Sequence, residues 1–582
     1  MNCLIDALKV LRGSSKEAVE NIKEFNPLKK YMHITRTIQK ELTDIIVQST
    51  ETESKQLILV CGSVGDGKSH ILSYLKNEKG LLKDFYVHND ATESISPDMT
   101  SIETLDKVLK GFRDENIGDG KKEKVIIAVN LGTLNNFIDS DIGKYYGILH
   151  KYVADSEILE SYTHETGFNP ESPFQHINFS DYHLYQLTKS GSHIGSDYIE
   201  ELIKKLTNKN EVNPFYQAYM RCSTCNICDK CPVKHNYELL GEEQVQKAII
   251  EILVEAMIKH KIIISTRSLL NFFYDILIGE EFSKKYYIGL NYQDKAIYYM
   301  NALMPNLLYS HPDYSVVLEQ ICKSDPMAIR SETVDEMIVK FNILDDVLSL
   351  VKDYTCITPY INVLEGMEIN KIAKEKKCVK KAFLELFIRL YRLHGIKGKL
   401  EIEDRVYQEF VDALYYYNAN DIRGLRGVYS NLREAIFKWN GGTSNNRVVV
   451  SLGKKQSKYM ISQELKIKEQ VQASKVDTNE KIERFVPYIM ARISDQEEKQ
   501  VESVNIDYAL FKLIRDIKNG YRPNIKDKNN FVSFVNTIER IYSFGQQKKE
   551  LTIENKNSEN KVQYVLKKTP FGFEFERIER YV

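Results

Sequence analysis

Over the first 280 residues, short apolar runs alternate with stretches in which apolar residues recur every three or four positions. The runs predict buried β-strands and the stretches predict helices, because side chains repeat every two residues along a strand and about every 3.6 along a helix. Strands that alternate with helices are typical of a mainly parallel sheet covered by helices. The predicted strands are 56–61, 85–88, 124–130 and 176–179, and the predicted helices include 68–76, 102–112 and 145–159.

Apolar residues have helical spacing in the first fifty residues, with a break at Asn26–Pro27. They have the same spacing in about two hundred residues that follow a cluster of four cysteines. A polar segment at 441–446 marks a boundary, and the chain beyond it mixes predicted helices and strands. We therefore expect an N-terminal helical segment at 1–50, an α/β domain at 51–280 with a cysteine-rich insertion at about 215–240, a helical domain at 281–440 and an α+β domain at 441–582.

The composition excludes several classes of protein. The 582 residues are 43% hydrophobic and 28% charged, which is typical of a folded chain with more than one core and not of a disordered one. No apolar run approaches the roughly 18 residues that a membrane span requires. Residues 1–9 are too acidic, and too short in their apolar part, for a secretory signal, so we expect a cytoplasmic protein without a membrane partner.

Positive charge is concentrated near the C-terminus. The net charge is -1, yet residues 441–582 hold 26 Lys and Arg against 19 Asp and Glu, whereas the rest holds 54 against 62. The balanced total predicts no global basic field, so any nucleic-acid surface has to be local.

The strongest chemical signal is a glycine-rich segment between the first predicted strand and its helix. It has the pattern G-x-x-x-x-G-K-S, in which glycines let backbone N–H groups face a phosphate. Lys68 would place a charge between the β- and γ-phosphates of ATP, and the Ser69 hydroxyl can bind Mg²⁺. We expect the nucleotide site to comprise Gly62, Ser63, Val64, Gly65, Asp66, Gly67, Lys68, Ser69 and His70.

Hydrolysis is less clearly indicated than binding. NTP hydrolases of this class usually end a later strand in an acidic residue that holds Mg²⁺, but the strand at 124–129 ends in Asn130. One interpretation is that Asn130 orients water, as a polar residue does in AAA-like ATPases, while Asp90 or Glu93 supplies the acid. The other is that hydrolysis is slow and the nucleotide acts as a switch or a structural ligand. We favour a weak but active ATPase.

Arg267 is a further catalytic candidate. It follows a Ser265–Thr266 pair that can cap a helix, and its place resembles that of an arginine that reaches the γ-phosphate from the lid of AAA-like ATPases. The helix dipole disfavours a cation in the first turn, so an anionic partner is expected. The alternative is a salt bridge with a surface glutamate.

Four cysteines at two-residue spacing indicate a metal site. Cys222, Cys225, Cys228 and Cys231 form two C-x-x-C pairs that together can supply a tetrahedral thiolate shell. Zn²⁺ fits best. A 4Fe–4S cluster is the alternative, although a ferredoxin run normally has three residues before its last cysteine. His235 is a substitute ligand in this interpretation, and a set of free thiols is the third reading.

Basic residues mixed with aromatic ones in the last quarter predict a contact with DNA, because such surfaces bind phosphates and stack bases. A mildly positive surface without a partner is the alternative. The residues concerned are Lys454, Lys455, Lys458, Tyr459, Lys512, Arg515, Lys518, Tyr521, Arg522 and Lys526.

Taken together, these motifs resemble the DptF family, the ATP-binding-motif proteins of phosphorothioation-dependent DNA restriction systems. The segments that carry the resemblance are Leu28–Ile34, Cys61–His70, Val129–Gly132, Cys222–Pro232, Thr266–Leu270 and Asn519–Asn524, which span nearly the whole chain.

The resemblance implies a subunit that acts with two sibling proteins, DptG and DptH, on double-stranded DNA lacking the host's sulfur mark. It also implies that Gly62, Gly65, Gly67, Lys68 and Ser69 bind ATP and Mg²⁺. We therefore expect an AAA-like P-loop ATPase core in a defence protein that can also form homo-oligomers. A nucleotide-gated scaffold or DNA-binding adaptor without significant hydrolysis is the alternative, and a transcription regulator is a third.

Overall fold

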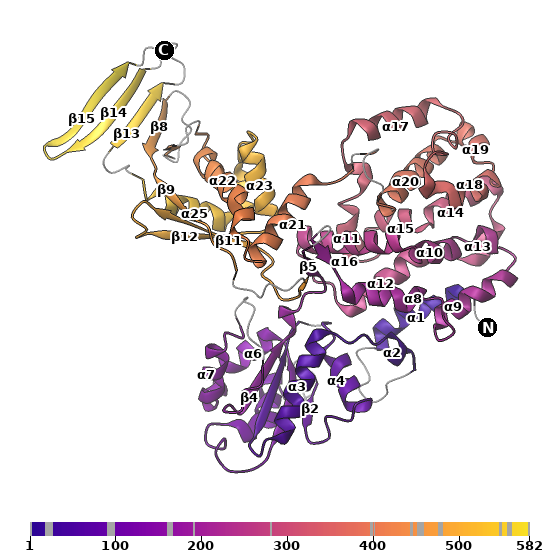
Figure 1. Ribbon diagram of the computed structural model, residues 1–582, viewed down its shortest axis with the longest axis horizontal. Coiled ribbons are helices and arrows are strands. Elements are labelled where there is room, and N and C mark those ends of the chain that lie inside the picture. The colour runs from indigo at the N-terminus through magenta and orange to yellow at the C-terminus, as the bar shows by residue number, and fades with distance from the viewer. Residues whose placement is uncertain are drawn as a thin grey trace. The chain divides into compact units, whose positions relative to one another are not determined.

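The computed structural model divides the chain into two compact units (Figure 1). Unit 1 comprises residues 1–186 and 195–403, and unit 2 comprises residues 187–194 and 404–582. The structure describes residues 3–17, 27–63, 65–89, 99–159, 167–189, 193–279, 282–395, 400, 402–442, 446–450, 459–474, 481–545, 550–555 and 562–579.

A four-stranded, all-parallel sheet forms the centre of one half of unit 1, as the hydrophobic runs predict. Its strands are β1 (Gln56–Cys61), β2 (Tyr86–His88), β3 (Lys124–Val129) and β4 (Phe174–Asn178), in the spatial order β2-β3-β1-β4. The register pairs Cys61 of β1 with Val129 of β3 and with Asn178 of β4. The carboxyl ends of these three strands therefore lie at the same edge of the sheet.

Helices cover both faces of this sheet because its central strands are apolar on both sides. On one face, Leu57, Leu59 and Cys61 pack with α5 (Ser101–Leu109), α6 (Leu131–Ile138) and α7 (Gly147–Asp155). On the other, Ile58 and Val60 pack with α3 (Thr37–Glu51) and α4 (Lys68–Asn77). Figure 1 shows α6 and α7 on one side of the strands and α3 and α4 on the other.

The N-terminal helices belong to unit 1 and not to a separate segment. Helix α1 (Leu4–Glu17) packs mainly against α12 (Thr266–Leu277) and also against α9 (Pro214–Met220), while α3 contributes to the core beneath the sheet. The remaining helices of unit 1 are α2 (Pro27–Met32), α8 (Asp197–Thr207), α10 (Pro232–Leu240), α11 (Glu243–His260), α13 (Lys284–Gly289), α14 (Tyr292–Asn301), α15 (Met304–Ser310), α16 (Val316–Cys322), α17 (Glu332–Ile343), α18 (Thr358–Glu365), α19 (Ile369–Glu375) and α20 (Lys377–Leu393).

Unit 2 combines helices with antiparallel sheets, and it begins earlier than the composition suggests. Helix α22 (Ile422–Lys438) packs against both α21 (Arg405–Asn418) and α23 (Tyr508–Lys518), so two helices expected in the middle domain share a core with the C-terminal region. The polar segment at 441–446 falls within the sequence of this unit. Trp439 lies in the same core, 4% exposed and edge-on to Phe534.

The sheets of unit 2 have the orders β10-β5-β6, β12-β11-β9 and β15-β14-β13-β8-β7. Their strands are β5 (Gln186–Thr188), β6 (Ile194–Gly195), β7 (Arg447–Val449), β8 (Tyr459–Glu464), β9 (Ile467–Gln470), β10 (Lys481–Ile482), β11 (Ile489–Asp495), β12 (Val501–Ile506), β13 (Glu550–Asn555), β14 (Val562–Thr569) and β15 (Gly572–Glu579), and the other helices are α24 (Ile525–Asn530) and α25 (Val532–Tyr542). Residues 187–194 interrupt the sequence of unit 1 but belong to unit 2. Strand β5 there pairs with β10. Among the described residues, no helix combines the length and apolar composition needed to cross a bilayer.

A buried arginine links the helices of unit 1. Only 5% of the Arg389 side chain is exposed, and its guanidinium lies 2.6 Å from an oxygen of Asp325. The same group donates hydrogen bonds to Asn306 (2.8 Å) and Ser310 (3.0 Å). Because Asp325 is itself only 14% exposed, removal of Arg389 would leave a carboxylate without its partner in a poorly hydrated site.

We expect Arg389→Leu to destabilise unit 1 by about 3 kcal/mol, the order found when one partner of a buried ion pair is removed. Lys381→Leu is the matched control on the same helix, because Lys381 is 77% exposed and its pair with Glu385 spans 3.7 Å. It should change stability by less than about 0.5 kcal/mol. Urea denaturation followed by circular dichroism measures both, and equal midpoint shifts for the two variants would contradict the assignment.

Candidate nucleotide site and cysteine pocket

The glycine-rich segment forms a tight loop at the carboxyl edge of the sheet. Three of its residues have backbone angles in the left-handed region, with φ of 148° at Gly62, 87° at Gly65 and 92° at Gly67. The N–H of Gly62 donates to the carbonyl of Val129, so the loop leaves β1 while still attached to β3. A side chain at Gly65 would lie 2.7 Å from Cβ of Ser265, so close packing also requires glycine there.

Helix α4 begins directly after this loop. Its N-cap is Gly67, which offers no side-chain acceptor to the first N–H groups of the helix. The start of a helix carries partial positive charge and unpaired donors, and a ten-residue helix such as α4 can present both to an anion. The first N–H groups of α4 are therefore not occupied by a capping side chain.

Lys68 and Asp66 hold the loop closed on itself. Lys68 Nζ donates to the carbonyls of Gly62 (2.9 Å) and Ser63 (2.6 Å). The Asp66 carboxylate accepts a hydrogen bond from the Ser63 N–H, so an internal anion occupies one of the loop donors. Burial raises the pKa of Asp66, while Lys68, the Ser63 N–H and Arg36 act in the opposite direction.

The hydroxyl of Ser69 points from the first turn of α4 and forms no hydrogen bond with any residue in the described ranges. His70, one residue further on, lies with Nε2 3.0 Å from Nδ1 of His33. Val64 lies outside the described residues, as do Asp90 and Glu93, so the two candidate acids after β2 have no described position.

Asn130 lies at the carboxyl end of β3, beside the loop, as expected from its place after the strand. Its side chain accepts a hydrogen bond from the Thr133 N–H (2.7 Å) and caps helix α6. Asn130 is half-buried. The capping hydrogen bond fixes the position of its side chain at the start of α6.

The start of α12 contacts the glycine-rich loop. Of the two residues expected to cap this helix, Ser265 is the N-cap and forms a capping box with Ser268, so the helix begins at Thr266. Ser265 packs against Gly65, and Thr266 Oγ1 lies 3.7 Å from where a Cβ on Gly67 would stand. Arg267 in this first turn is half-buried and has no ion pair or hydrogen bond with residues that the structure describes.

Sequence reasoning missed several groups around the loop. Arg36, just before α3, donates to the carbonyl of Asp66 (3.1 Å) and lies over the Tyr198 ring. The Tyr198 hydroxyl donates to Thr266 Oγ1 (3.3 Å), and burial raises its pKa. At the end of β4, Asp181 is 8% exposed and lies 3.4 Å from the Asn178 amide. No local spacing signals these residues, because four distant segments bring them together.

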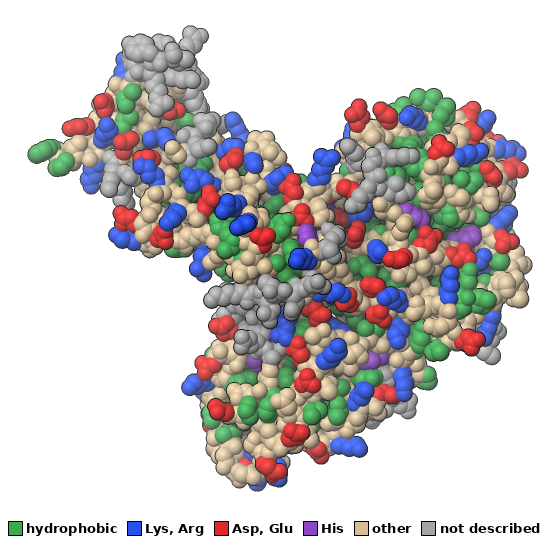
Figure 2. Space-filling view, in the orientation of Figure 1, with side chains coloured by type: hydrophobic (Ala, Val, Ile, Leu, Met, Phe, Trp, Pro, Cys, Tyr) green, Lys and Arg blue, Asp and Glu red, His purple; other side chains and the backbone are tan. Residues whose placement is uncertain are grey.

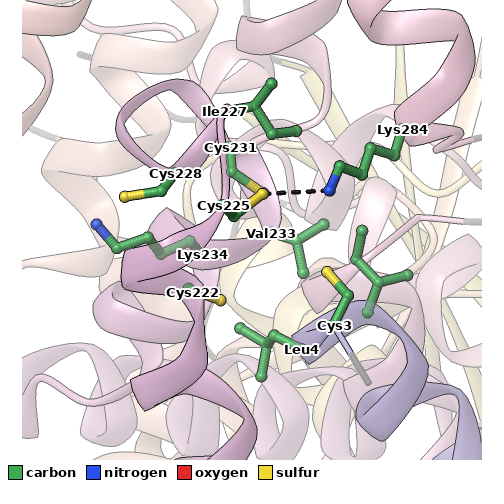
Figure 3. A pocket seen from close by; sticks show the side chains of 11 residues that line it. Cys3, Leu4, Cys222, Cys225, Ile227, Cys228, Cys231, Val233, Lys234 and Lys284 are labelled. Carbon is green, nitrogen blue, oxygen red and sulfur yellow. Dashed lines mark hydrogen bonds between the residues drawn. The ribbon is translucent and has the colours of Figure 1, made fainter. Parts of the chain in front are cut away.

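The four clustered cysteines line one small pocket together with a fifth, Cys3, from the N-terminus (Figure 3). Cys222 and Cys228 lie in two short turns, at 221–224 and 228–230 between α9 and α10, and Cys225 and Cys231 directly follow these turns. Among the described residues, no three His, Cys, Asp or Glu side chains already converge as a closed metal shell. His235 is absent from the pocket lining, and its Nδ1 lies 2.6 Å from the Tyr299 hydroxyl.

The thiols of this pocket differ in their surroundings. Burial raises the pKa of Cys222, of Cys228 and, to about 11, of Cys231. For Cys225, burial acts in the same direction, but the N–H of Ile227 and the ammonium of Lys284 outweigh it and leave the pKa lowered. Lys284 Nζ lies 3.2 Å from the Cys225 sulfur.

No protein-family model matches the sequence, and a search of curated proteins finds no match.

His33, which stacks on Tyr74 beside the loop, should make the stability of the fold depend on pH in the acid range. Its ring lies 3.7 Å from that of Tyr74, nearly parallel to it, and burial lowers its pKa to about 4, with Lys205 and Lys79 acting in the same direction. An unfolded chain takes up this proton near pH 6.5, whereas the folded chain resists it until about pH 4. Stability should therefore fall as the pH drops from 6.5 toward 4.

We expect His33→Asn to flatten this acid dependence by about 1 kcal/mol between pH 7 and pH 5, whatever its effect at pH 7. Melting temperatures measured across that range by scanning calorimetry provide the test. His150→Asn, on the exposed side of α7, is the control and should leave the slope of stability against pH unchanged. An unaltered slope in the His33 variant would exclude this histidine as the source.

Proposed function

We propose that this chain is a P-loop nucleotide-binding protein of AAA-like type that binds ATP with Mg²⁺ at residues Gly62–His70. The observation that carries the proposal is the glycine-rich loop itself, which joins a buried parallel strand to a helix with no side chain capping its start. In the proposed site, Lys68 would bind the phosphates and the Ser69 hydroxyl would bind Mg²⁺, the roles that a lysine and a hydroxyl residue have in this motif.

In the proposed bound state, phosphate oxygens replace internal partners of the loop. Lys68 leaves the carbonyls of Gly62 and Ser63 for the β- and γ-phosphates, and the Ser63 N–H exchanges the Asp66 carboxylate for phosphate. The loop thus has its donors oriented before the ligand arrives, which lowers the cost of ordering them.

Turnover requires groups beyond the loop. We propose that Asn130 orients the attacking water, that Asp90 or Glu93 supplies the acid, and that Arg267 neutralises charge on the γ-phosphate. Support for Arg267 comes from the contacts of its neighbours, Ser265 and Thr266, with Gly65 and Gly67. Charge-assisted hydrogen bonds to a phosphate are stronger than neutral ones, so even one such arginine has a measurable effect.

We further propose that the chain is the ATP-binding subunit of a phosphorothioation-dependent DNA restriction system, acting with DptG and DptH on unmodified double-stranded DNA. The support is the resemblance of six segments to the DptF family and the basic character of residues 441–582. Zn²⁺, or a 4Fe–4S cluster as the alternative, would occupy the cysteine pocket.

The structure narrows the residues available to contact DNA. Lys512, Arg522 and Lys526 are exposed, as is Tyr521. Arg515 instead pairs with Glu409 (2.7 Å), and Lys518 donates to Asn431 (2.8 Å), so both serve the packing of unit 2. Lys454, Lys455 and Lys458 lie outside the described residues. On the face shown in Figure 2, basic and acidic side chains are interspersed.

The second candidate is a nucleotide-gated scaffold or DNA-binding adaptor without significant ATP hydrolysis. The observation that favours it is Asn130, a helix cap at the strand end where a carboxylate would be expected. Phosphate release by purified protein, with and without DNA and the partner subunits, separates the two functions. Binding without turnover under every condition would favour the scaffold.

We expect Lys68→Ala to weaken Mg²⁺-ATP binding by about 10- to 100-fold, because a charged donor to phosphate contributes about 1.5–3 kcal/mol. Lys76→Ala, an exposed lysine at the other end of α4, is the matched control and should bind as the wild type does. Isothermal titration calorimetry measures both. Wild-type protein without affinity for ATP, or equal affinities in all three proteins, would refute the nucleotide site.

Arg267→Ala should weaken the binding of ATP by about tenfold while leaving that of ADP nearly unchanged, because only ATP carries the γ-phosphate. Arg330→Ala is the control, since Arg330 is 87% exposed and pairs with Asp335. Competition between each nucleotide and a fluorescent analogue gives the two affinities. Equal losses for ATP and ADP would assign Arg267 to the packing of α12 instead.

A further inference from the structure

The cysteine pocket is built from two parts of the chain that are far apart in sequence. Cys3, Leu4 and Ile5 close one side of it, and the segment that carries the four clustered cysteines closes the other. Figure 3 shows the thiol of Cys3, at the start of the N-terminal helix, directed toward this pocket. Five of the nine cysteines of the protein therefore gather at one place.

Packing of helix α1 holds Cys3 there. Leu4, Leu8 and Leu11 are almost fully buried, and the helix packs mainly against α12 and also against α9 and α10. The helix that follows the fourth clustered cysteine is α10, so the same contacts bring Cys3 and Cys231 to one site. The packing of α1 in the core of unit 1 thus fixes the position of Cys3.

Cys228 differs from the other thiols. Its sulfur lies 3.3 Å from Oδ1 of Asp229, its own neighbour, and in Figure 3 it points away from the side of the pocket that holds Cys3 and Lys284. Cys222 and Cys231 are 8% and 7% exposed, and Cys225 faces Lys284. Four thiols other than Cys228 are thus available to one central ion.

Size favours a single ion over a cluster. The space inside the pocket is about 10 Å³, which is about the volume that one water molecule needs. A divalent ion with four thiolates carries two negative charges, and two lysines, Lys234 and Lys284, line the same pocket. The soft sulfur donors suit Zn²⁺, which binds four thiolates tetrahedrally in structural sites.

We propose that Cys3 is a metal ligand, and that Cys3, Cys222, Cys225 and Cys231 bind one Zn²⁺ ion while Cys228 remains outside the shell. Binding would draw the four thiols together and release their protons to water, with no change in oxidation state. The site would clip the N-terminal helix to the cysteine-rich turns. This inference is independent of nucleotide binding and would survive the failure of that proposal.

Metal analysis of the full-length protein tests the ligand set. Wild-type protein and the single variants Cys3→Ser, Cys225→Ser, Cys228→Ser and Cys378→Ser are purified, dialysed against a mild chelator and analysed for zinc and iron by mass spectrometry. Cys378 is an exposed cysteine on α20 and serves as the control. We expect one zinc per chain in the wild type and in the Cys228 and Cys378 variants. Affinity should fall by about 100-fold or more in the Cys3 and Cys225 variants, since loss of even an outer partner of a ligand costs about 10- to 100-fold.

Cobalt substitution separates lost ligation from damaged folding. Sulfur-to-cobalt charge-transfer absorption reports how many thiolates bind the ion, so the wild type and Cys228→Ser should show four and Cys3→Ser should show three. Circular dichroism verifies that each variant is folded. Four thiolates in Cys3→Ser with three in Cys228→Ser, iron in place of zinc, or no bound metal in the wild type would each overturn the proposal.

Discussion

The burial of strand β1 between two parallel neighbours is the constraint on which the candidate site depends. All six of its residues are buried, and its register with β3 and β4 fixes where the chain emerges at the carboxyl edge of the sheet. Three glycines with positive φ then turn the backbone into helix α4 within six residues. The register of a buried strand is strongly specified, so the position at which the loop leaves the sheet is fixed.

Helix α12 is common to both sites described above. The residues at its start contact the glycine-rich loop. The helix also packs against α1, and α1 begins beside the cysteine pocket. The loop and the pocket are thus supported by one helix, although they bind different ligands in our proposals. Arg36 adds a hydrogen bond to the loop from another segment, and Tyr198 donates to Thr266 at the start of α12.

The sequence alone allowed the parallel sheet to be predicted, because its strands are short apolar runs separated by helical spacing. The glycine-rich loop and the start of α12 could also be predicted, since glycine patterns and capping serines are local signals. The domain boundary near residue 441 could not. The polar segment there resembles a linker. Helix α22, which precedes this segment, nevertheless packs against α23, which follows it. Only the packing reveals which helices share a core.

Local chemistry thus determined the strands, the helices, the glycine-rich loop and the four clustered cysteines, because each depends on residues close together in the chain. Tertiary structure alone decided that Cys3 lines the cysteine pocket, that Arg36 reaches the loop, that Tyr198 reaches Thr266 beside it, and that Asp181 is buried just after β4. These residues come from segments separated by up to more than two hundred positions, and no spacing in the sequence records which buried surfaces meet. Hydrophobic packing made that choice, since it brings together whichever apolar faces can exclude water from one another.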